Sequence, residues 1–115
     1  MSPPPHARPV EIDCRSVKAK LDAGESFLLL DCREREEHQL VNIKAAHLLP
    51  MSELTERVEE LQPYRNSEIV VHCHHGGRSM KVAAWLLEQG FSDVKSMAGG
   101  IDVWSLEIDK SLPRY

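Results

Sequence analysis

Short apolar runs alternate along this chain with segments in which apolar residues recur at helical spacing. Two runs, at 27–32 and 69–72, have the length and composition of buried strands, and 94–97 is a last strand candidate. A shorter run at 10–12 and a weaker one at 47–49 add two further candidates. Strands that alternate with helices are typical of a parallel sheet covered on both faces. The pattern therefore predicts an α/β fold with a mostly parallel, five-stranded sheet and helices on both faces.

The segments between these runs carry apolar residues every three or four positions, as an amphipathic helix does. Asp13 is suited to cap the first helix, and Gly24 is suited to end it. Ser52 is a candidate cap for a helix that Pro63 ends. The expected helices occupy 13–24, 34–40, 52–63 and 79–89, with a last turn or two over 100–107.

The chain length bounds the domain organisation. Its 115 residues are enough for one domain with a core of its own. We assign that domain to 10–115. The segment 1–9 contains four prolines and no apolar core of a signal peptide, so we expect a disordered or extended tail there.

Composition narrows the setting and the partners. The formal charge of −4 argues against nucleic acid or an anionic membrane as the main partner. No apolar stretch approaches the ~18 residues that a membrane-spanning helix needs. The three cysteines are an odd number, so disulfides cannot pair them all, and we expect a reduced, cytoplasmic setting.

The stretch 73–79 carries the clearest chemical signal. Cys73 directly follows the strand at 69–72, two glycines form the turn, and a helix begins at Ser79. Free N–H groups and the dipole at a helix start favour an anion there. Cysteines in such settings have pKa values of roughly 3.5–7.5, so a reactive thiolate is expected. The few polar residues of 79–89 predict a buried helix, which fixes the direction of those N–H groups.

The spacing from Cys73 to Arg78 limits what the loop can hold. Four residues separate them, and the phosphate-binding loop of a Cys-x-x-x-x-x-Arg phosphatase is one residue longer. The shorter loop has a tighter radius and encloses something the size of a single sulfur atom. Phosphatase or arsenate reductase activity is therefore the weaker alternative, although the trailing Ser79 is shared.

This loop resembles the active-site loop of the rhodanese family, whose single-domain members show Cys-x-x-Gly-x-Arg-Ser before a helix. Segment 28–34 is similar to the family's strand followed by Asp-x-Arg-Glu, and 99–104 is similar to its terminal Gly-Gly-x-x-x-Trp signature. The three matches stand in the right order and cover the chain from about residue 10 to 115. The resemblance implies a rhodanese-like single domain. The loop positions are filled by Cys73, Gly76, Arg78 and Ser79.

The resemblance also implies sulfur transfer through a Cys73 persulfide. The thiolate takes a sulfane sulfur from a small anion such as thiosulfate, and the outer sulfur lies among the N–H groups of 74–78. Cyanide, a thiol or a thioredoxin-like protein then accepts the sulfur. We expect no metal and no organic cofactor. A sulfur relay to a partner protein and a non-catalytic interaction module are the alternatives, and the presence of Cys73 argues against the second.

Four residues after the cysteine are candidates for substrate binding. Gly76 and Gly77 suit a tight loop that needs a positive φ or a close approach of backbone donors. His74 and His75 stand where the family is variable and where side chains at the entrance help to choose the donor. Their protonation would attract a dianion more strongly, so the KM for thiosulfate is predicted to fall as pH drops.

Arg78, also a candidate for substrate binding, has two possible roles. Its guanidinium could attract the anionic donor, or it could turn inward and bond loop carbonyls or the Asp31 carboxylate, which we favour. We interpret Asp31 as a framework residue rather than a general base, because a preformed thiolate needs none. Arg33 and Glu34 are interpreted as an ion pair, or as a helix-start carboxylate, that braces the site, with Ser79 in support.

Other polar residues have simpler interpretations. A metal site over 72–75 is disfavoured, because adjacent residues on a strand point to opposite faces and cannot surround one zinc ion. His72 is expected to be a hydrogen-bonded strand residue, and Cys14 a core residue. Cys32 could resolve an oxidised Cys73, although packing is the simpler interpretation.

The segment 41–46 departs from the family pattern. Similar proteins usually show Gly-His-Ile-Pro-Gly-Ala there, so three turn-forming or rigid residues are absent. Ala45 in place of glycine makes a left-handed conformation costly, which leaves the shape of this loop open. His38 likewise stands where an aromatic residue is common.

Overall fold

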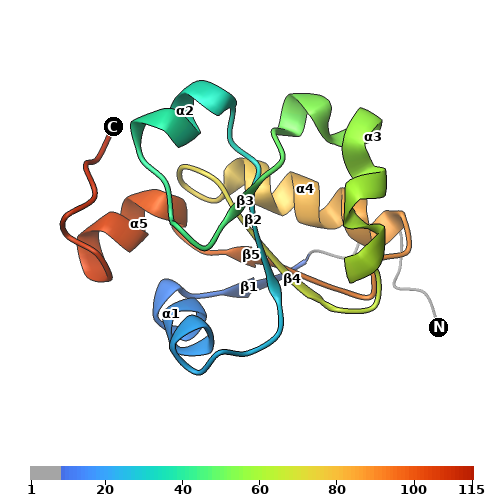
Figure 1. Cartoon of the computed structure of the whole chain (residues 1–115), viewed down its shortest axis with the longest axis horizontal. Coiled ribbons are helices and arrows are strands. Elements are labelled where there is room, and N and C mark those ends of the chain that lie inside the picture. Colours follow the sequence, from blue (N-terminus) through green and yellow to red (C-terminus); the bar gives the residue numbers. More distant parts are fainter. Residues whose placement is uncertain (1–8) are drawn as a thin grey trace.

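The structure, a computed structural model, describes residues 9–115 (Figure 1). Within these residues one sheet has five strands in the order β1-β5-β4-β2-β3. All neighbouring strands pair in parallel, which confirms the predicted α/β architecture. The strands are β1 Val10–Ile12, β2 Leu28–Asp31, β3 His47–Leu48, β4 Glu68–His72 and β5 Asp93–Met97.

Helices cover both faces of this sheet, as predicted. Helices α1 and α5 pack on one face, and α3 and α4 pack on the other (Figure 1). Helix α2 contains no buried residue and follows β2 directly. The helices are α1 Cys14–Asp22, α2 Arg35–Leu40, α3 Leu54–Arg57, α4 Gly77–Glu88 and α5 Gly100–Glu107.

Strand β4 forms the centre of the sheet, between β2 and β5. Ile69 and Val71 join the core under α3 and α4, whereas Val70 joins the core under α1 and α5. This alternation is the geometry of a strand. All three are fully buried, and burial of each side chain contributes about 1.5–3 kcal/mol. The core thus fixes the end of β4, where Cys73 follows.

Two helix starts follow from local hydrogen bonding. The Asp13 carboxylate caps α1 and accepts the N–H of Ser16 at 2.7 Å, as predicted. Helix α2 begins with a reciprocal arrangement in which the side chains of Glu34 and Glu37 each accept the other's backbone N–H. Such paired caps satisfy two N–H groups that the helix itself leaves free.

The predicted continuous helix over 52–63 is wrong. Pro63 lies inside a 3₁₀ segment rather than at the end of a helix, and it has no N–H to donate to an α-helical bond there. Ser52 is not a cap, because its hydroxyl donates to Glu34 Oε1 at 2.5 Å. The segment divides into a 3₁₀ turn Met51–Glu53, helix α3 and a 3₁₀ segment Val58–Tyr64.

Two other boundaries differ from expectation. Helix α4 begins at Gly77 rather than at Ser79, with Gly76 as its N-cap. In the segment 41–46, Ala45 avoids the left-handed region, since positive φ occurs only at glycines in the described chain. The departure from the family pattern therefore leaves no strained residue in this loop.

The N-terminal segment was predicted to be a disordered or extended tail over 1–9. Residues 1–8 lie outside the described part, and Pro9 is buried. None of the helices within 9–115 has the length and apolar character that crossing a membrane requires.

Candidate active site

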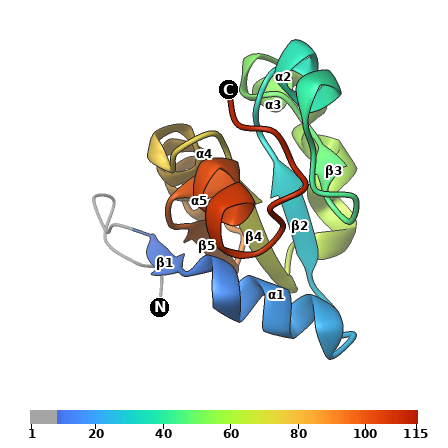
Figure 2. The ribbon, with the colours of Figure 1, turned by 90° about the vertical axis from the view of Figure 1, so that its left-hand side faces the viewer.

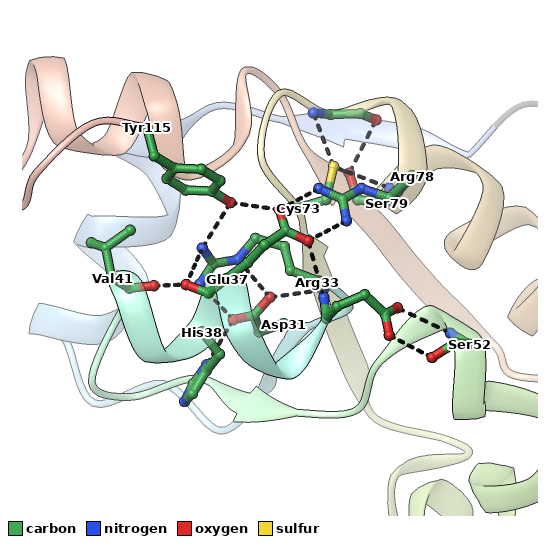
Figure 3. Close-up of polar contacts among 12 residues, drawn as sticks. Asp31, Arg33, Glu37, His38, Val41, Ser52, Cys73, Arg78, Ser79 and Tyr115 are labelled. Carbon is green, nitrogen blue, oxygen red and sulfur yellow. Dashed lines mark hydrogen bonds and ion pairs between the residues drawn. The ribbon is translucent and has the colours of Figure 1, made fainter.

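The carboxyl ends of three neighbouring strands meet at one edge of the sheet, where open α/β folds place their sites. Asp31 ends β2, Cys73 follows β4, and Gly99 lies shortly after β5. These are the strand ends at which the sequence predicts a site. Figure 3 shows the side chains that gather there from β2, α2 and the start of α4.

Backbone hydrogen bonds tie the residues after β4 to the start of α5. The N–H of Ile101 donates to the Cys73 carbonyl at 2.9 Å, and the N–H of Asp102 donates to the His74 carbonyl at 3.1 Å. A Cβ on Gly100 would lie 2.5 Å from the Cys73 carbonyl oxygen and closer still to that of His74. The close approach of two backbones therefore requires glycine at this position.

The Cys73 sulfur lies among donors at the start of α4. The N–H of Gly76 donates to Sγ at 3.1 Å and the N–H of Ser79 donates at 3.3 Å. The Ser79 Oγ lies 3.5 Å from the same sulfur. Cys73 as a whole is 1% exposed. The sulfur thus sits at the positive end of a helix, with two amide N–H groups directed at it.

These contacts change the acidity of the thiol. The pKa of Cys73 is lowered to about 4, and the largest cause is the neighbouring Cys32 thiol acting as a hydrogen-bond donor. Burial opposes this effect, while the hydroxyl and N–H of Ser79 and the N–H of Gly76 lower the pKa further. The arrangement therefore favours a thiolate at neutral pH.

Ser79 holds the loop as well as the sulfur. Its side chain is fully buried, its hydroxyl donates to the Gly76 carbonyl at 3.1 Å, and its oxygen lies 2.7 Å from the Ser96 Oγ on β5. Ser96 is also fully buried and was not among the predicted site residues. Its place in the predicted strand 94–97, beside Lys95, gave no specific signal for it.

The two loop glycines differ. Gly76 has a φ of +114°, which favours glycine, whereas Gly77 has no positive φ and belongs to the first turn of α4. A Cβ on Gly77 would meet no atom within 4 Å. The predicted need for positive φ therefore applies to Gly76 alone.

Arg78 turns away from the partners that the sequence suggests. Its guanidinium forms two parallel bonds to Glu37, with Nη1 to Oε1 at 2.7 Å and Nη2 to Oε2 at 2.8 Å (Figure 3). The prediction that it bonds Asp31 or loop carbonyls is wrong. Arg78 is the largest cause that lowers the pKa of Glu37 to about 2. Glu37 was missed, and its place three residues after the helix cap Glu34 was the available signal.

Asp31 and Arg33 form a fully buried ion pair. Arg33 Nε donates to Asp31 Oδ1 at 3.0 Å, and Nη2 donates to Oδ2 at 2.8 Å. Nη2 also donates to the Val41 carbonyl at 2.7 Å. Burial raises the pKa of Asp31 and is the largest single influence, but the bonds from Arg33, together with the nearby His72 and His38, lower the pKa to about 2. Arg33 therefore pairs with Asp31 and not with Glu34, which serves α2 instead.

Comparison with known proteins identifies this arrangement. The family described as Rhodanese-like domain matches residues 13–107. The chain belongs to the rhodanese-like domain family. The putative sulfurtransferase YtwF of Bacillus subtilis (strain 168) is 37% identical over 97 residues, and the match covers 84% of this chain and 91% of that protein.

Two further comparisons extend this assignment. The rhodanese-like domain protein of Staphylococcus aureus has a TM-score of 0.78 and 26% identity, covering 92% of this chain and 98% of that one. Adenylyltransferase and sulfurtransferase MOCS3-2 of Zea mays is 34% identical over 109 residues, which are 90% of this chain but 23% of that protein. The chain thus spans less than a quarter of its maize relative. Relatives named sulfurtransferases support sulfur transfer in general terms.

The two adjacent histidines of this rhodanese-like domain, His74 and His75, have different surroundings. Their rings lie 3.8 Å apart at their centroids. His75 is exposed, and its Nδ1 lies 3.8 Å from Asp102. His74 is half-buried, its Nε2 has no hydrogen-bond partner within 9–115, and its ring stacks on Tyr115 at 3.9 Å. Only His75 has the open position expected of an entrance residue.

Two further histidines contact the buried ion pair. His38 Nδ1 lies 2.8 Å from Asp31 Oδ2, a polar contact that a phenylalanine at this position could not make. His72 is fully buried, and within 9–115 neither of its ring nitrogens has a hydrogen-bond partner. The expectation of a hydrogen-bonded strand residue is therefore wrong. Burial lowers the pKa of His72, which favours its neutral form.

The other cysteines lie on opposite faces of the sheet. Cys14 is buried in the core under α1 and α5, as predicted, and burial raises its pKa to about 11. Cys32 lies in the same core cluster as Cys73, and its N–H donates to the His72 carbonyl at 3.0 Å. Strand β2 pairs with β4, and Asp31 is paired with His72. The residues that follow, Cys32 and Cys73, therefore lie next to each other at the ends of the two strands.

Residues 9–115 contain no group of three or more histidine, cysteine, aspartate or glutamate side chains placed to hold a metal ion. The run 72–75 does not converge: His72 points into the core near Asp31, and His75 faces Asp102. These directions agree with the argument that adjacent residues cannot surround one ion.

Proposed function

We propose that this domain is a sulfurtransferase that carries sulfur as a Cys73 persulfide. The thiolate attacks the sulfane sulfur of a small anionic donor such as thiosulfate. The Sγ–S bond forms as the S–S bond of the donor breaks, and sulfite leaves with the electron pair. A thiophilic acceptor then takes the outer sulfur and restores the Cys73 thiolate.

The observation that carries this proposal is the environment of the Cys73 sulfur. Two amide N–H groups, from Gly76 and Ser79, are directed at Cys73 Sγ, and the pKa of the thiol is about 4. A thiolate that is formed at neutral pH needs no general base. Asp31 has no such role in this proposal, because its carboxylate is engaged by Arg33.

The proposed acceptors are cyanide, a small thiol or the thiol of a thioredoxin-like protein. Transfer of the outer sulfur to any of them is one nucleophilic displacement, and cyanide gives the simplest assay. Phosphatase or arsenate reductase activity is disfavoured by the short loop between Cys73 and Arg78.

Access to the sulfur is the step that the surroundings control. Cys73 is 1% exposed, so a donor reaches the sulfur only when the loop over 74–78 moves and exposes it. His75 is exposed in this loop, and Arg78 is partly exposed, with 34% of its side chain accessible. We propose that these side chains meet the donor anion before the sulfur does.

Intact mass spectrometry tests the proposal. After thiosulfate treatment and removal of excess donor, the wild type should gain the mass of one sulfur atom, located at Cys73 by peptide analysis. Cyanide should remove that mass. Cys73→Ser should show no gain, and Cys14→Ser, which replaces a core cysteine on the other face, should show the full gain. A wild type that gains nothing, or that gains sulfur at another cysteine, contradicts the proposal.

A further inference from the structure

The side chain of Tyr115 reaches back to the active site from the end of the chain. Its hydroxyl accepts a hydrogen bond from Arg33 Nη1 at 2.9 Å and donates one to Glu37 Oε2 at 2.8 Å. Figure 2 shows the last residues running back towards α2, and Figure 3 shows the ring beside Glu37 and Arg33. The contact spans 78 positions of sequence to Glu37.

The ring of Tyr115 makes a second contact, with the loop that follows Cys73. It lies on the His74 ring with centroids 3.9 Å apart and an interplanar angle of 5°. The Arg33 guanidinium lies 5.8 Å from the Tyr115 centroid. One side chain therefore joins three parts of the site: the cysteine loop, helix α2 and the buried ion pair.

The Glu37 carboxylate connects Tyr115 to Arg78. Its Oε2 accepts both the Tyr115 hydroxyl and Arg78 Nη2, and its Oε1 accepts Arg78 Nη1 and the N–H of Glu34. A carboxylate held by this many donors has one orientation. Burial raises the pKa of Tyr115, so the hydroxyl keeps the proton that it donates.

We propose that Tyr115 is a positioning residue of the sulfur-transfer site, which holds Arg78 through Glu37 and holds His74 by stacking. The inference rests on the proposed function, because it concerns how the donor anion is received. The Cys73 sulfur takes its N–H bonds from Gly76 and Ser79, whereas Tyr115 contacts Arg33, Glu37 and His74. Tyr115 therefore affects donor binding rather than the reactivity of the sulfur.

Two substitutions separate the hydroxyl from the ring. Tyr115→Phe removes the two hydrogen bonds of the hydroxyl and keeps the stack on His74. Tyr115→Leu removes the hydrogen bonds and the stack. A side chain that must be ordered on binding weakens binding by about 2- to 10-fold. We expect Tyr115→Phe to raise the KM for thiosulfate by about that factor and Tyr115→Leu to raise it further, with kcat unchanged in both. Tyr64→Phe, at an exposed tyrosine just before the opposite end of β4, is the matched control.

Steady-state sulfur transfer from thiosulfate to cyanide gives KM and kcat, and the pH profile of Cys73 alkylation shows whether the thiol has changed. A raised KM with an unchanged profile supports the proposal. A wild-type KM in Tyr115→Phe and Tyr115→Leu, or an altered alkylation profile, overturns it. Thermal melts identify a variant that has simply lost its fold, and in that case Tyr115→Phe decides the outcome.

A second measurement does not depend on activity. Carbethoxylation of His74, followed by peptide mass spectrometry, should be faster in Tyr115→Leu than in the wild type and unchanged in Tyr64→Phe, because the ring covers His74. An equal rate in Tyr115→Leu overturns the stacking role. If the wild type forms no persulfide, the proposed function fails, and this rate still decides whether Tyr115 holds the loop.

Discussion

Replacing Asp31 by asparagine tests how firmly the buried ion pair holds the strand edge at which Cys73 lies. The substitution keeps the shape of the side chain but removes its charge. Arg33, fully buried, then loses the anion that accepts its Nε and Nη2. It keeps bonds from Nη2 to the Val41 carbonyl and from Nη1 to the Tyr115 hydroxyl.

The expected loss of stability follows from these contacts. Removal of one partner of a buried ion pair costs about 3–5 kcal/mol, because the remaining charge is left without compensation. Since Arg33 keeps these two acceptors and the Glu37 carbonyl, which accepts from Nη1 at 3.3 Å, we expect the lower end, about 3 kcal/mol. Urea unfolding at neutral pH measures this difference. Asp22→Asn is the control, because Asp22 forms an exposed pair with Lys18 that contributes about 1 kcal/mol or less.

The pH dependence gives a second arm of the same test. The pKa of Asp31 is about 2 in the folded protein, below its usual 3.8. The stabilisation is therefore complete above about pH 4 and is lost as the pH falls towards about 2. This shift corresponds to about 2 kcal/mol. Asp31→Asn lacks that titration, so the stability difference from the wild type should shrink by roughly this amount. A loss below about 1 kcal/mol at neutral pH, or a difference independent of pH, refutes the reasoning.

Two further predictions concern the cysteine loop. Gly100→Ala should lower the free energy of unfolding in urea by roughly 2 kcal/mol or more, because its Cβ meets the Cys73 and His74 carbonyls. The variant should also form little persulfide by mass spectrometry. Wild-type stability would show that the two backbones can separate. Cys32→Val should raise the pH midpoint of Cys73 alkylation by about one unit, and an unchanged midpoint would leave Cys32 a packing residue only.

Strands β2 and β4 were predictable because each contains a short, buried apolar run bounded by turn residues. The three runs that form β2, β4 and β5 fall within one or two residues of their predicted limits. Asp13 was predictable as a cap because its bond to Ser16 is local. The segment after Ser52 was not, since the serine bonds Glu34, which lies 18 residues earlier, instead of its own helix.

The position of Cys73 was predictable for the same local reason: a strand, a glycine turn and a helix follow one another in sequence. The supporting contacts were not, because they join distant residues. Arg78 meets Glu37 across 41 positions, and Arg33 meets Tyr115 across 82. A charge pattern alone allows Arg78 several carboxylates, and only the packing of α2 against the loop selects Glu37.

The central claim is that the Cys73 sulfur is an anion at neutral pH, held by N–H groups at the start of α4. The rate of Cys73 alkylation by iodoacetamide, followed by peptide mass spectrometry, measures this directly. With a pKa of about 4, the rate should be constant from about pH 5.5 to about pH 9. A rate that climbs about tenfold per pH unit and levels off only near pH 8.5, as for an ordinary cysteine, would contradict the account.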